Sequence, residues 1–432
     1  MASKPQCKYG AGCYRKNAQH LKEFYHPKMK SDEDDHEQPE KKKKKMVAEE
    51  PKQKGATISD FFGKKKVDDK DEEDVSDVGP SSTSSGAAAF LNSSPKDDAE
   101  ESPDDEDDDD DMPSSPEDLK ENIKRKFLVE MPDDFYDFWE FCKSKNSKHP
   151  EDAMSKDLGF QLVGPYDILA GKHKGVKRNR RGKRPNFLLH WRYYYDPPEF
   201  QTVVKSDDKN LFHLGYFRDD PAELPVFVGA NKAADSYIIT QKGNNIFAAI
   251  KLVIDERLKS KDIDAGKKKK LQNFQEELQD FADSKKYPLD MKTKSMKDRD
   301  KKVVCRTFHG AGMVVPLDEN EVGYREVPEE PADLKKMFKA VVEAKSESDR
   351  DKRMEAIQEI VTLVQFANDE CDYGEGLELG LDLFSYGGEP LHSIISHLLP
   401  LAYQLLGRHE YSQIIEAHLR RRSRSANLSE LE

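Results

Sequence analysis

Cysteine, tryptophan and long apolar runs are all scarce in this chain. Its 432 residues include 5 Cys and 2 Trp. No apolar run approaches the ~20 residues that a membrane helix needs, and the first residues lack the apolar core of a secretory signal peptide. Cys142, Cys305 and Cys371 are scattered and odd in number, so they predict no disulfide framework. These absences favour an intracellular protein with no membrane partner.

Charge is abundant but unevenly distributed. The formal net charge is -13, yet Lys41–Lys45 and Lys64–Lys66 are unbroken lysine runs. Such runs are typical of nuclear-import signals, with solvated tail charge as the alternative. Asp97–Asp111 is almost wholly acidic, which favours a solvating spacer over a contact with basic proteins such as histones. Residues 31–114 are too polar to bury a core, so we expect a disordered charged linker.

The N-terminus carries the spacing C-x5-C-x6-H-x5-H within residues 1–30. Two thiolates and two imidazoles are the donors of a closed tetrahedral zinc site, and so small a module depends on the metal to fold. The gap between the Cys pair and the His pair is too short for the ββα finger that reads the major groove. The predicted zinc ligands are Cys7, Cys13, His20 and His26.

The stretch "CKYGAGCYRKNAQHLKEFYHP" is similar to the poly(ADP-ribose)-binding zinc fingers. In that family two aromatic residues and an arginine contact adenine rings and phosphates, and the matching residues here are Tyr9, Tyr14 and Arg15. Stacking platforms beside positive charge suit a flexible anionic polymer. The resemblance therefore implies poly(ADP-ribose) as a partner, while a purely structural zinc knob is the alternative.

One short apolar segment interrupts the charged linker. In "ATISDFFGKKK", Ile58, Phe61 and Phe62 have one-turn helical spacing and are followed by lysines. A triplet of this kind is typical of an anchor that folds on a partner groove. It resembles the motif that docks on the sliding clamp of replication, although Gly55 stands where that motif normally has Gln. The alternative is an accidental hydrophobic island.

From about Ser115 the pattern predicts an α+β body, a mixed sheet-and-helix fold with a mostly helical C-terminal part. Ser115 and Pro116 indicate a helix start, and apolar periodicity predicts helices over residues 132–144 and 245–258. We expect the α+β part over 115–300 and the helical part over 301–432. Runs rich in β-branched and aromatic residues predict strands over 186–195, 199–204, 211–217, 225–229, 236–240 and 303–317.

A strongly basic loop spans residues 171–184, in "GKHKGVKRNRRGKRPN". It contains no acidic residue and no interleaved aromatic residue. Two interpretations stay open: a mobile solvated loop, or a sequence-independent contact with DNA phosphates or an acidic partner.

Lysine and arginine are absent from Glu355 to Gly407, whereas acids are not. Clustered carboxylates raise one another's pKa and attract a cation, so such a group binds metal, docks on a basic surface or offers a general base. From composition alone, a solvated helix end is favoured. The chain has no Gly-rich phosphate loop, nucleophile elbow or HExxH motif, so we expect no NAD site of its own. The acids of this cluster are Asp369, Glu370, Asp372, Glu375, Glu378 and Asp382.

Five stretches of the body carry a specific resemblance: "LGFQLVGPYDILAGKHK", "LHWRYYYDPPEFQTVV", "GYFRDDPAE", "KKVVCRTFHGAGMVVPLDENEVGYREVPE" and "VQFANDECDYGEGLELGLDLF". Through them residues 115–425 resemble the histone PARylation factor family. That family binds DNA-break-activated poly(ADP-ribose) polymerases, completes their active site and directs ADP-ribosylation to serine. The resemblance implies that Glu370 is the catalytic glutamate and that Tyr324, Arg325 and Asp369 contact the polymerase.

The resemblances together predict a nuclear accessory factor that acts on chromatin at DNA breaks and modifies histones through its partner polymerase. We expect no enzyme activity of the chain alone, zinc in the finger, and NAD used by the polymerase. Two other classes are carried forward. One is a non-catalytic adaptor that binds chromatin and poly(ADP-ribose), and the other is a hydrolase of ADP-ribose that uses the acidic cluster.

Overall fold

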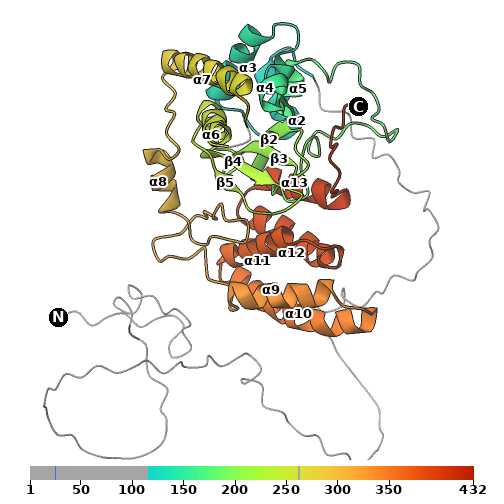
Figure 1. Cartoon of the computed structure of the whole chain (residues 1–432). Coiled ribbons are helices and arrows are strands. Elements are labelled where there is room, and N and C mark those ends of the chain that lie inside the picture. Colours follow the sequence, from blue (N-terminus) through green and yellow to red (C-terminus); the bar gives the residue numbers. More distant parts are fainter. Residues whose placement is uncertain (1–24, 26–114, 261–262) are drawn as a thin grey trace, which may run out of the picture. The chain divides into compact units, whose positions relative to one another are not determined.

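A five-stranded antiparallel sheet lies at the centre of the folded body (Figure 1). The structure, a computed structural model, describes Tyr25 and residues 115–260 and 263–432. The strands pair in chain order. Short connections join β2 to β5 one after another, whereas residues 163–199 separate β1 from β2. They are β1 (Phe160–Leu162), β2 (Phe200–Ser206), β3 (Phe212–Phe217), β4 (Phe227–Lys232) and β5 (Thr240–Gln241). The predicted zinc ligands, the polymer-binding residues and the clamp motif all lie outside the described residues.

Aromatic residues at helical spacing build the first layer of helices. Phe138 and Phe141 lie on one face of α3 and contact Phe247 of α6 at centroid distances of 5.1 and 6.2 Å. The predicted helices over 132–144 and 245–258 are therefore present. The helices are α2 (Leu119–Phe127), α3 (Asp133–Lys145), α4 (Ser155–Leu158), α5 (Pro165–Leu169), α6 (Ile246–Leu258), α7 (Ala265–Lys285) and α8 (Lys294–Asp300).

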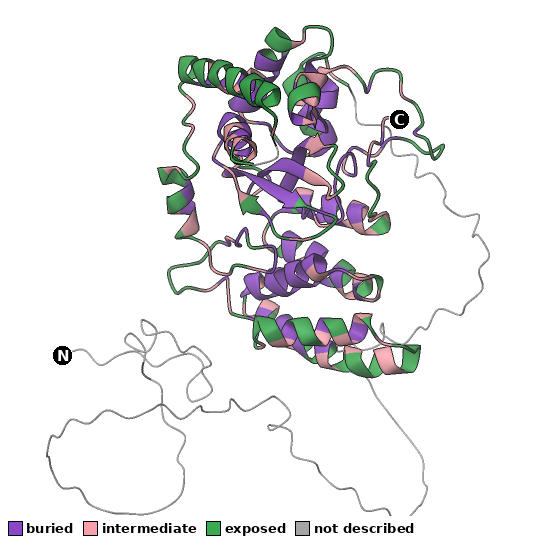
Figure 2. Ribbon diagram, in the orientation of Figure 1, coloured by how far each residue is buried: buried purple, intermediate pink, exposed green. Residues whose placement is uncertain are grey.

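The C-terminal part is helical, as the sequence predicts, and α11 is its centre. Every residue from Gly374 to Ser385 is buried (Figure 2). Gly380 permits the close approach of α12, because a Cβ there would lie 2.8 Å from Leu399 Cγ. The helices are α9 (Pro331–Val342), α10 (Glu347–Asp369), α11 (Tyr373–Tyr386), α12 (His392–Leu405) and α13 (His409–Arg420).

Two tyrosines attach the C-terminal helices to the sheet. Tyr403 of α12 donates to the carboxylate of Glu199, just before β2, at 2.9 Å. Tyr411 of α13 donates to the carbonyl of Arg218, just after β3, at 3.2 Å. The described residues from 115 onward accordingly belong to one compact unit. Within its described residues, no helix is long and apolar enough to cross a membrane.

Three segments predicted as strands have other conformations. In residues 236–240 only Thr240 belongs to a strand. Residues 186–195 contain turns and no strand. Side-chain hydrogen bonds hold this segment in place of strand pairing, because Arg192 donates to the carbonyls of Pro197 and Phe200. The aromatic residues of this segment are mostly buried, which explains its strand-like composition. Residues 303–317 contribute a single isolated bridge between Cys305 and Met313.

The first helix begins later than the Ser115–Pro116 pair predicts. Asp118 is the N-cap of α2, and its carboxylate accepts from the backbone amide of Lys120 at 3.0 Å. The Ser115 hydroxyl accepts instead from Lys126 Nζ at 2.9 Å. Since Asp caps a helix as well as Ser does, local sequence alone did not separate the two starts.

Candidate functional site

The corner between α10 and α11 presents the predicted catalytic glutamate. α10 ends at Asp369, Glu370 is its C-cap, and α11 begins at Tyr373. Cys371 makes the turn with φ of 66°, in the left-handed region that non-glycine residues seldom adopt. The corner is fixed from outside, because the amide of Gly374 donates to the carbonyl of Gly323 at 2.8 Å. Two helices and a crossing segment thus hold Glu370 in place.

Four of the clustered acids form a buried stripe along α11 and hold the segment 305–327. Their spacing places Asp372, Glu375, Glu378 and Asp382 on one side of the helix. Asp372 accepts from the amide of Gly323 at 3.0 Å and Asp382 from the amide of Phe308 at 2.7 Å. Glu378 accepts from Cys305 Sγ and from the Tyr324 hydroxyl, each at 2.9 Å. The prediction of a solvated helix end is wrong for these four residues.

Burial changes the acidity of this stripe. It raises the pKa of Glu378, although the Cys305 and Tyr324 hydrogen bonds oppose the shift. Burial also raises the pKa of Asp382 to about 8, with the Phe308 amide opposing it. The pKa of the Cys305 thiol rises to about 12 through burial and the neighbouring Glu378. These groups are buried and hydrogen-bonded within the fold, so we assign them a structural rather than a catalytic role.

Arg325 connects the buried stripe to the exposed corner. Its Nε donates to Glu375 and its Nη1 to Glu370, each at 2.9 Å. The Glu375 side chain is 2% exposed, whereas those of Arg325 and Glu370 are 25% and 28% exposed. The sequence interpretation treats Arg325 as a partner contact, and the structure adds a role in the fold. Glu370 is therefore held by a cation and remains reachable from outside.

Exposed residues flank Glu370 on the last turn of α10. Asp369 is exposed, and Phe366 is 57% exposed. Sequence reasoning missed Phe366, because an apolar residue of an amphipathic helix is expected on its buried face. The signal was in the spacing: the buried face of α10 consists of Ile357, Ile360, Val364 and Ala367, a register that excludes Phe366.

The structure brings together three of the four predicted core-site residues. Glu370 and Arg325 are in contact, and Tyr324 lies beside Arg325 with its hydroxyl directed inward to Glu378. The fourth residue, Asp369, precedes Glu370 and is exposed on the last turn of α10. The half-buried Tyr324 ring packs against the core, so it is a support of the corner as well as part of its surface.

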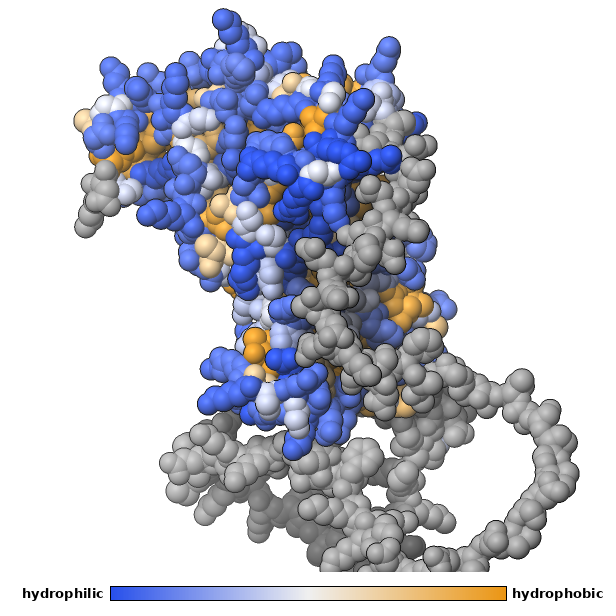
Figure 3. Space-filling view, turned by 90° about the vertical axis from the view of Figure 1, so that its right-hand side faces the viewer, coloured by the Kyte–Doolittle hydropathy of each residue, from blue (hydrophilic) through white to orange (hydrophobic). Residues whose placement is uncertain are grey.

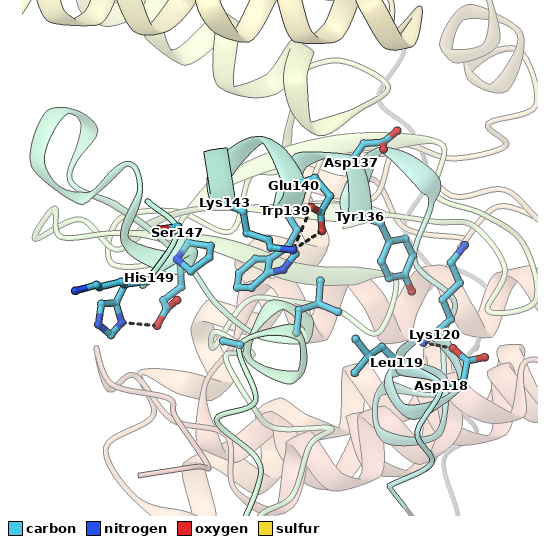
Figure 4. A pocket seen from close by; sticks show the side chains of 15 residues that line it. Asp118, Leu119, Lys120, Tyr136, Asp137, Trp139, Glu140, Lys143, Ser147 and His149 are labelled. Carbon is cyan, nitrogen blue, oxygen red and sulfur yellow. Dashed lines mark hydrogen bonds and ion pairs between the residues drawn. The ribbon is translucent and has the colours of Figure 1, made fainter. Parts of the chain in front are cut away.

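A hollow of about 650 Å³ lies elsewhere, over α2, α3 and residues 147–151 (Figure 4). Trp139 and Tyr136 line it, and charges of both signs surround them. His149, Glu151 and Asp152 have ligand atoms within 4.8 Å of one another. Lys172, however, lies 3.8 Å from Glu151 and supplies a cation there. None of the Glu370-corner residues lines this hollow.

Comparison with known proteins identifies the family of this chain. The family model for histone PARylation factor 1 matches residues 118–422, and the PBZ domain model, of CCHH zinc-finger type, matches residues 4–29. Histone PARylation factor 1 of Mus musculus is 53% identical over 306 residues, covering 71% of this chain and 87% of the relative. The Bos taurus protein is 52% identical over 308 residues, covering 71% and 88%, and that of Danio rerio 50% over 315 residues, covering 73% and 88%. The chain belongs to the histone PARylation factor 1 family and carries a PBZ zinc-finger domain at its N-terminus.

Proposed function

We propose that this protein is an accessory factor that binds a DNA-break-activated poly(ADP-ribose) polymerase and supplies Glu370 as a general base. The supporting observation is the position of Glu370. It lies at a solvent-facing corner, 2.9 Å from Arg325, whereas the acids of the following helix α11 are buried. A reactive carboxylate carried by packed helices is held more accurately than one on a free loop. The corner suits a group that completes another protein's active site.

The chemistry explains why the added base changes the acceptor to serine. A serine hydroxyl is a poor nucleophile near neutral pH, because its proton has to leave as the bond to ribose forms. A carboxylate within hydrogen-bond reach accepts that proton. Acidic acceptor side chains are already ionised near pH 7 and need no such base. The polymerase binds NAD and performs the transfer: the serine oxygen bonds to the ribose, the ribose–nicotinamide bond breaks and nicotinamide leaves. Glu370 accepts the proton from serine on histones and other chromatin proteins.

The surface around Glu370 fits a protein partner. Phe366 offers an exposed aromatic anchor, and Asp369 offers an exposed carboxylate. Exposed aromatic residues such as Phe366 are enriched at interfaces, and an exposed carboxylate favours a partner surface of opposite charge. Arg325 and Tyr324 contribute from the crossing segment. In this proposal the partner contacts these four residues, and Glu370 lies next to the reaction centre of the partner.

The two alternative classes make different demands on the acidic cluster. A hydrolase of ADP-ribose needs several free carboxylates to hold and activate water, but four of the six acids are occupied in holding the segment 305–327. This argues against the hydrolase. A non-catalytic adaptor that binds chromatin and poly(ADP-ribose) needs no exposed glutamate beside an arginine. It stays as the second candidate and is distinguished by whether Glu370 is required.

The N-terminal finger extends this function. Cys7, Cys13, His20 and His26 would hold zinc, and Tyr9, Tyr14 and Arg15 would contact poly(ADP-ribose); the PBZ match at residues 4–29 supports this assignment. The polymer made at a break would then retain the factor there. The lysine runs at Lys41–Lys45 and Lys64–Lys66 favour the nucleus. The clamp-like motif is a separate, weaker hypothesis for a replication partner.

A reconstituted reaction tests the proposal. Polymerase, broken DNA, NAD and a histone peptide are combined with and without this chain, and acceptor residues are assigned by mass spectrometry. The proposal predicts serine modification only when the chain is present. Removal of ADP-ribose from a modified peptide by the chain alone would support the hydrolase. Unchanged acceptors with normal polymerase binding would support the adaptor.

A further inference from the structure

The basic loop 171–184 is held in a defined conformation by the C-terminal segment. Asn179 is buried, and its Nδ2 donates to Glu430 Oε2 at 2.9 Å. Asn179 Oδ1 accepts from the amides of Arg181 and Lys183 at 3.0 and 3.2 Å. One side chain thus closes the loop on itself and attaches it to a segment 251 residues further along the chain. The interpretation as a freely solvated loop does not fit this geometry.

One carboxylate oxygen of Glu430 joins the loop to a second basic segment, residues 420–424. Besides Asn179, Glu430 Oε2 accepts from Arg421 Nη2 at 2.9 Å. Glu430 is 5% exposed, and its amide donates to His190 Nδ1 at 3.0 Å. Arg180 makes a second contact with this segment through Glu432. The loop (green, at the right of Figure 1) and the C-terminal segment (dark red) therefore lie side by side.

Cations from both segments face outward on this side of the body. We call them the basic surface. Within the loop, Lys172 pairs with Asp167 at 2.9 Å, and no acidic residue occurs from 171 to 186. Figure 3 looks onto this side, and strongly hydrophilic side chains gather over its upper part. The exposed members are Lys172, Lys174, Lys177, Arg178, Arg180, Arg181, Lys183, Arg184, Arg420 and Arg424.

We infer that the basic surface binds the phosphate backbone of double-stranded DNA without reading its sequence. Like charges repel, so a loop with this many cations expands unless something opposes it. The Asn179–Glu430 contact opposes it and keeps the cations in one place. A fixed array of cations, with few acids nearby, gains affinity for a regularly spaced polyanion by releasing its counterions. This inference is independent of the Glu370 corner and goes beyond the function proposed for it.

The neighbouring aromatic residues favour duplex DNA over a single-stranded or flexible polymer. Binding of such polymers depends on aromatic faces onto which free bases can stack. Here Arg422 lies 3.9 Å from the Tyr194 centroid, and Arg424 covers Tyr194 and Tyr195 at 4.0 and 5.2 Å. Trp191 is buried beneath Lys205. Duplex DNA needs no such aromatic faces, because its bases stack on one another and its phosphates alone can contact the cations.

The basic surface and the Glu370 corner lie toward opposite ends of α11. Arg422 donates to the carbonyl of Phe384 near the C-terminal end of this helix, at 2.7 Å. Arg325 pairs with Glu375 near the other end. Nine residues of helix separate Glu375 from Phe384, a rise of about 14 Å. The residues of the basic surface and those of the Glu370 corner are therefore different.

Fluorescence anisotropy with a labelled blunt duplex tests this inference on the full chain. The triple variant Lys174→Gln/Lys177→Gln/Arg181→Gln removes three exposed charges and leaves the Asn179 contact intact. The matched control, Lys267→Gln/Lys268→Gln/Lys269→Gln on α7, removes the same charge from exposed positions on a different element. We expect the loop variant to bind at least tenfold more weakly at 100 mM salt, with a salt slope reduced by about 2 to 3. The control should change binding less than threefold.

A charge-neutral variant separates preorganisation from charge. Asn179→Ala removes the Asn179–Glu430 contact and keeps every cation, so we expect several-fold weaker duplex binding. The helical circular dichroism signal should be retained. Equal losses in the loop and α7 variants would overturn the site. So would duplex binding unchanged in the loop variant. In a Cys13→Ala background, which disables the finger, loop-dependent binding of poly(ADP-ribose) tighter than that of duplex would reassign the surface to the polymer and refute the inference.

Discussion

Arg325→Ala is expected to destabilise the fold and also to disrupt partner binding, and the two effects can be separated. The guanidinium bridges Glu370 and Glu375, each at 2.9 Å, and the Glu375 side chain is 2% exposed. Truncation leaves that carboxylate buried without its cation. Leaving a buried charged acceptor unpaired costs about 1–3 kcal/mol.

Protonation of Glu375 limits this cost. Burial already raises the pKa of Glu375, and Arg325 opposes the shift. Without Arg325 the carboxyl can become neutral, and protonating an ordinary glutamate at pH 7 costs about 3.4 kcal/mol. That value is an upper limit, because the pKa starts from a raised value. We therefore expect a loss of about 1–3 kcal/mol in urea unfolding, with an unchanged m-value.

The double variant Arg325→Ala/Glu375→Gln isolates the interface role. A neutral glutamine needs no cation, so the double variant should recover most of the lost stability, with a coupling energy of about 1–2 kcal/mol. Polymerase binding should stay weak, because the arginine is still missing at the surface. Unchanged stability of Arg325→Ala would refute the bridge. Recovery of binding together with stability would refute the contact with the partner.

Three further predictions concern the buried acids and the N-terminal region. Burial raises the pKa of Asp382 to about 8, so its contribution to stability is present below its ordinary pKa and is lost as pH rises to about 8. Asp382→Asn should become increasingly more stable than the wild type from pH 5 to 8 in chemical unfolding, by up to about 1.4 kcal/mol per unit, and the difference should level off above pH 8. Parallel curves would contradict this. Cys13→Ala should abolish zinc binding and poly(ADP-ribose) binding by the finger, whereas Tyr14→Ala should keep zinc and lose about 1–3 kcal/mol of polymer affinity; zinc-loaded residues 1–30 that ignore the polymer would show the assignment to be wrong. A peptide containing the clamp-like motif should bind the sliding clamp weakly in calorimetry, and Phe61→Ala/Phe62→Ala should remove the heat; no heat from the wild-type peptide would eliminate this partner.

The sequence predicted the elements whose periodicity is strong. The helix over 132–144 and the helical C-terminal part were correct, because apolar residues repeat there at helical spacing. The segment 186–195 misled the same reasoning. Its aromatic residues are buried in turns that side chains such as Arg192 stabilise through long-range hydrogen bonds. Local composition contains no information about those partners.

The residues of the candidate site could be named from the sequence, but their arrangement could not be predicted. The motif around Glu370 and the Tyr324–Arg325 pair could be recognised from the sequence. The sequence could not divide the acids into a buried stripe and an exposed corner, since that division depends on the segment 305–327 crossing α11. The same holds for the basic loop, whose conformation depends on Glu430, 251 residues from Asn179. Contacts between distant segments are set by the fold as a whole.

The most direct test of the account is to compare Glu370→Gln with Glu359→Gln, an exposed glutamate on the same helix. Each variant is added to polymerase, broken DNA, NAD and a histone peptide, and acceptor residues are assigned by mass spectrometry alongside a binding measurement. The account predicts that both variants bind the polymerase with near wild-type affinity, that Glu359→Gln supports serine modification, and that Glu370→Gln reduces it by roughly 10²–10⁴-fold. Undiminished serine modification with Glu370→Gln would contradict the general-base role and leave the adaptor as the better explanation.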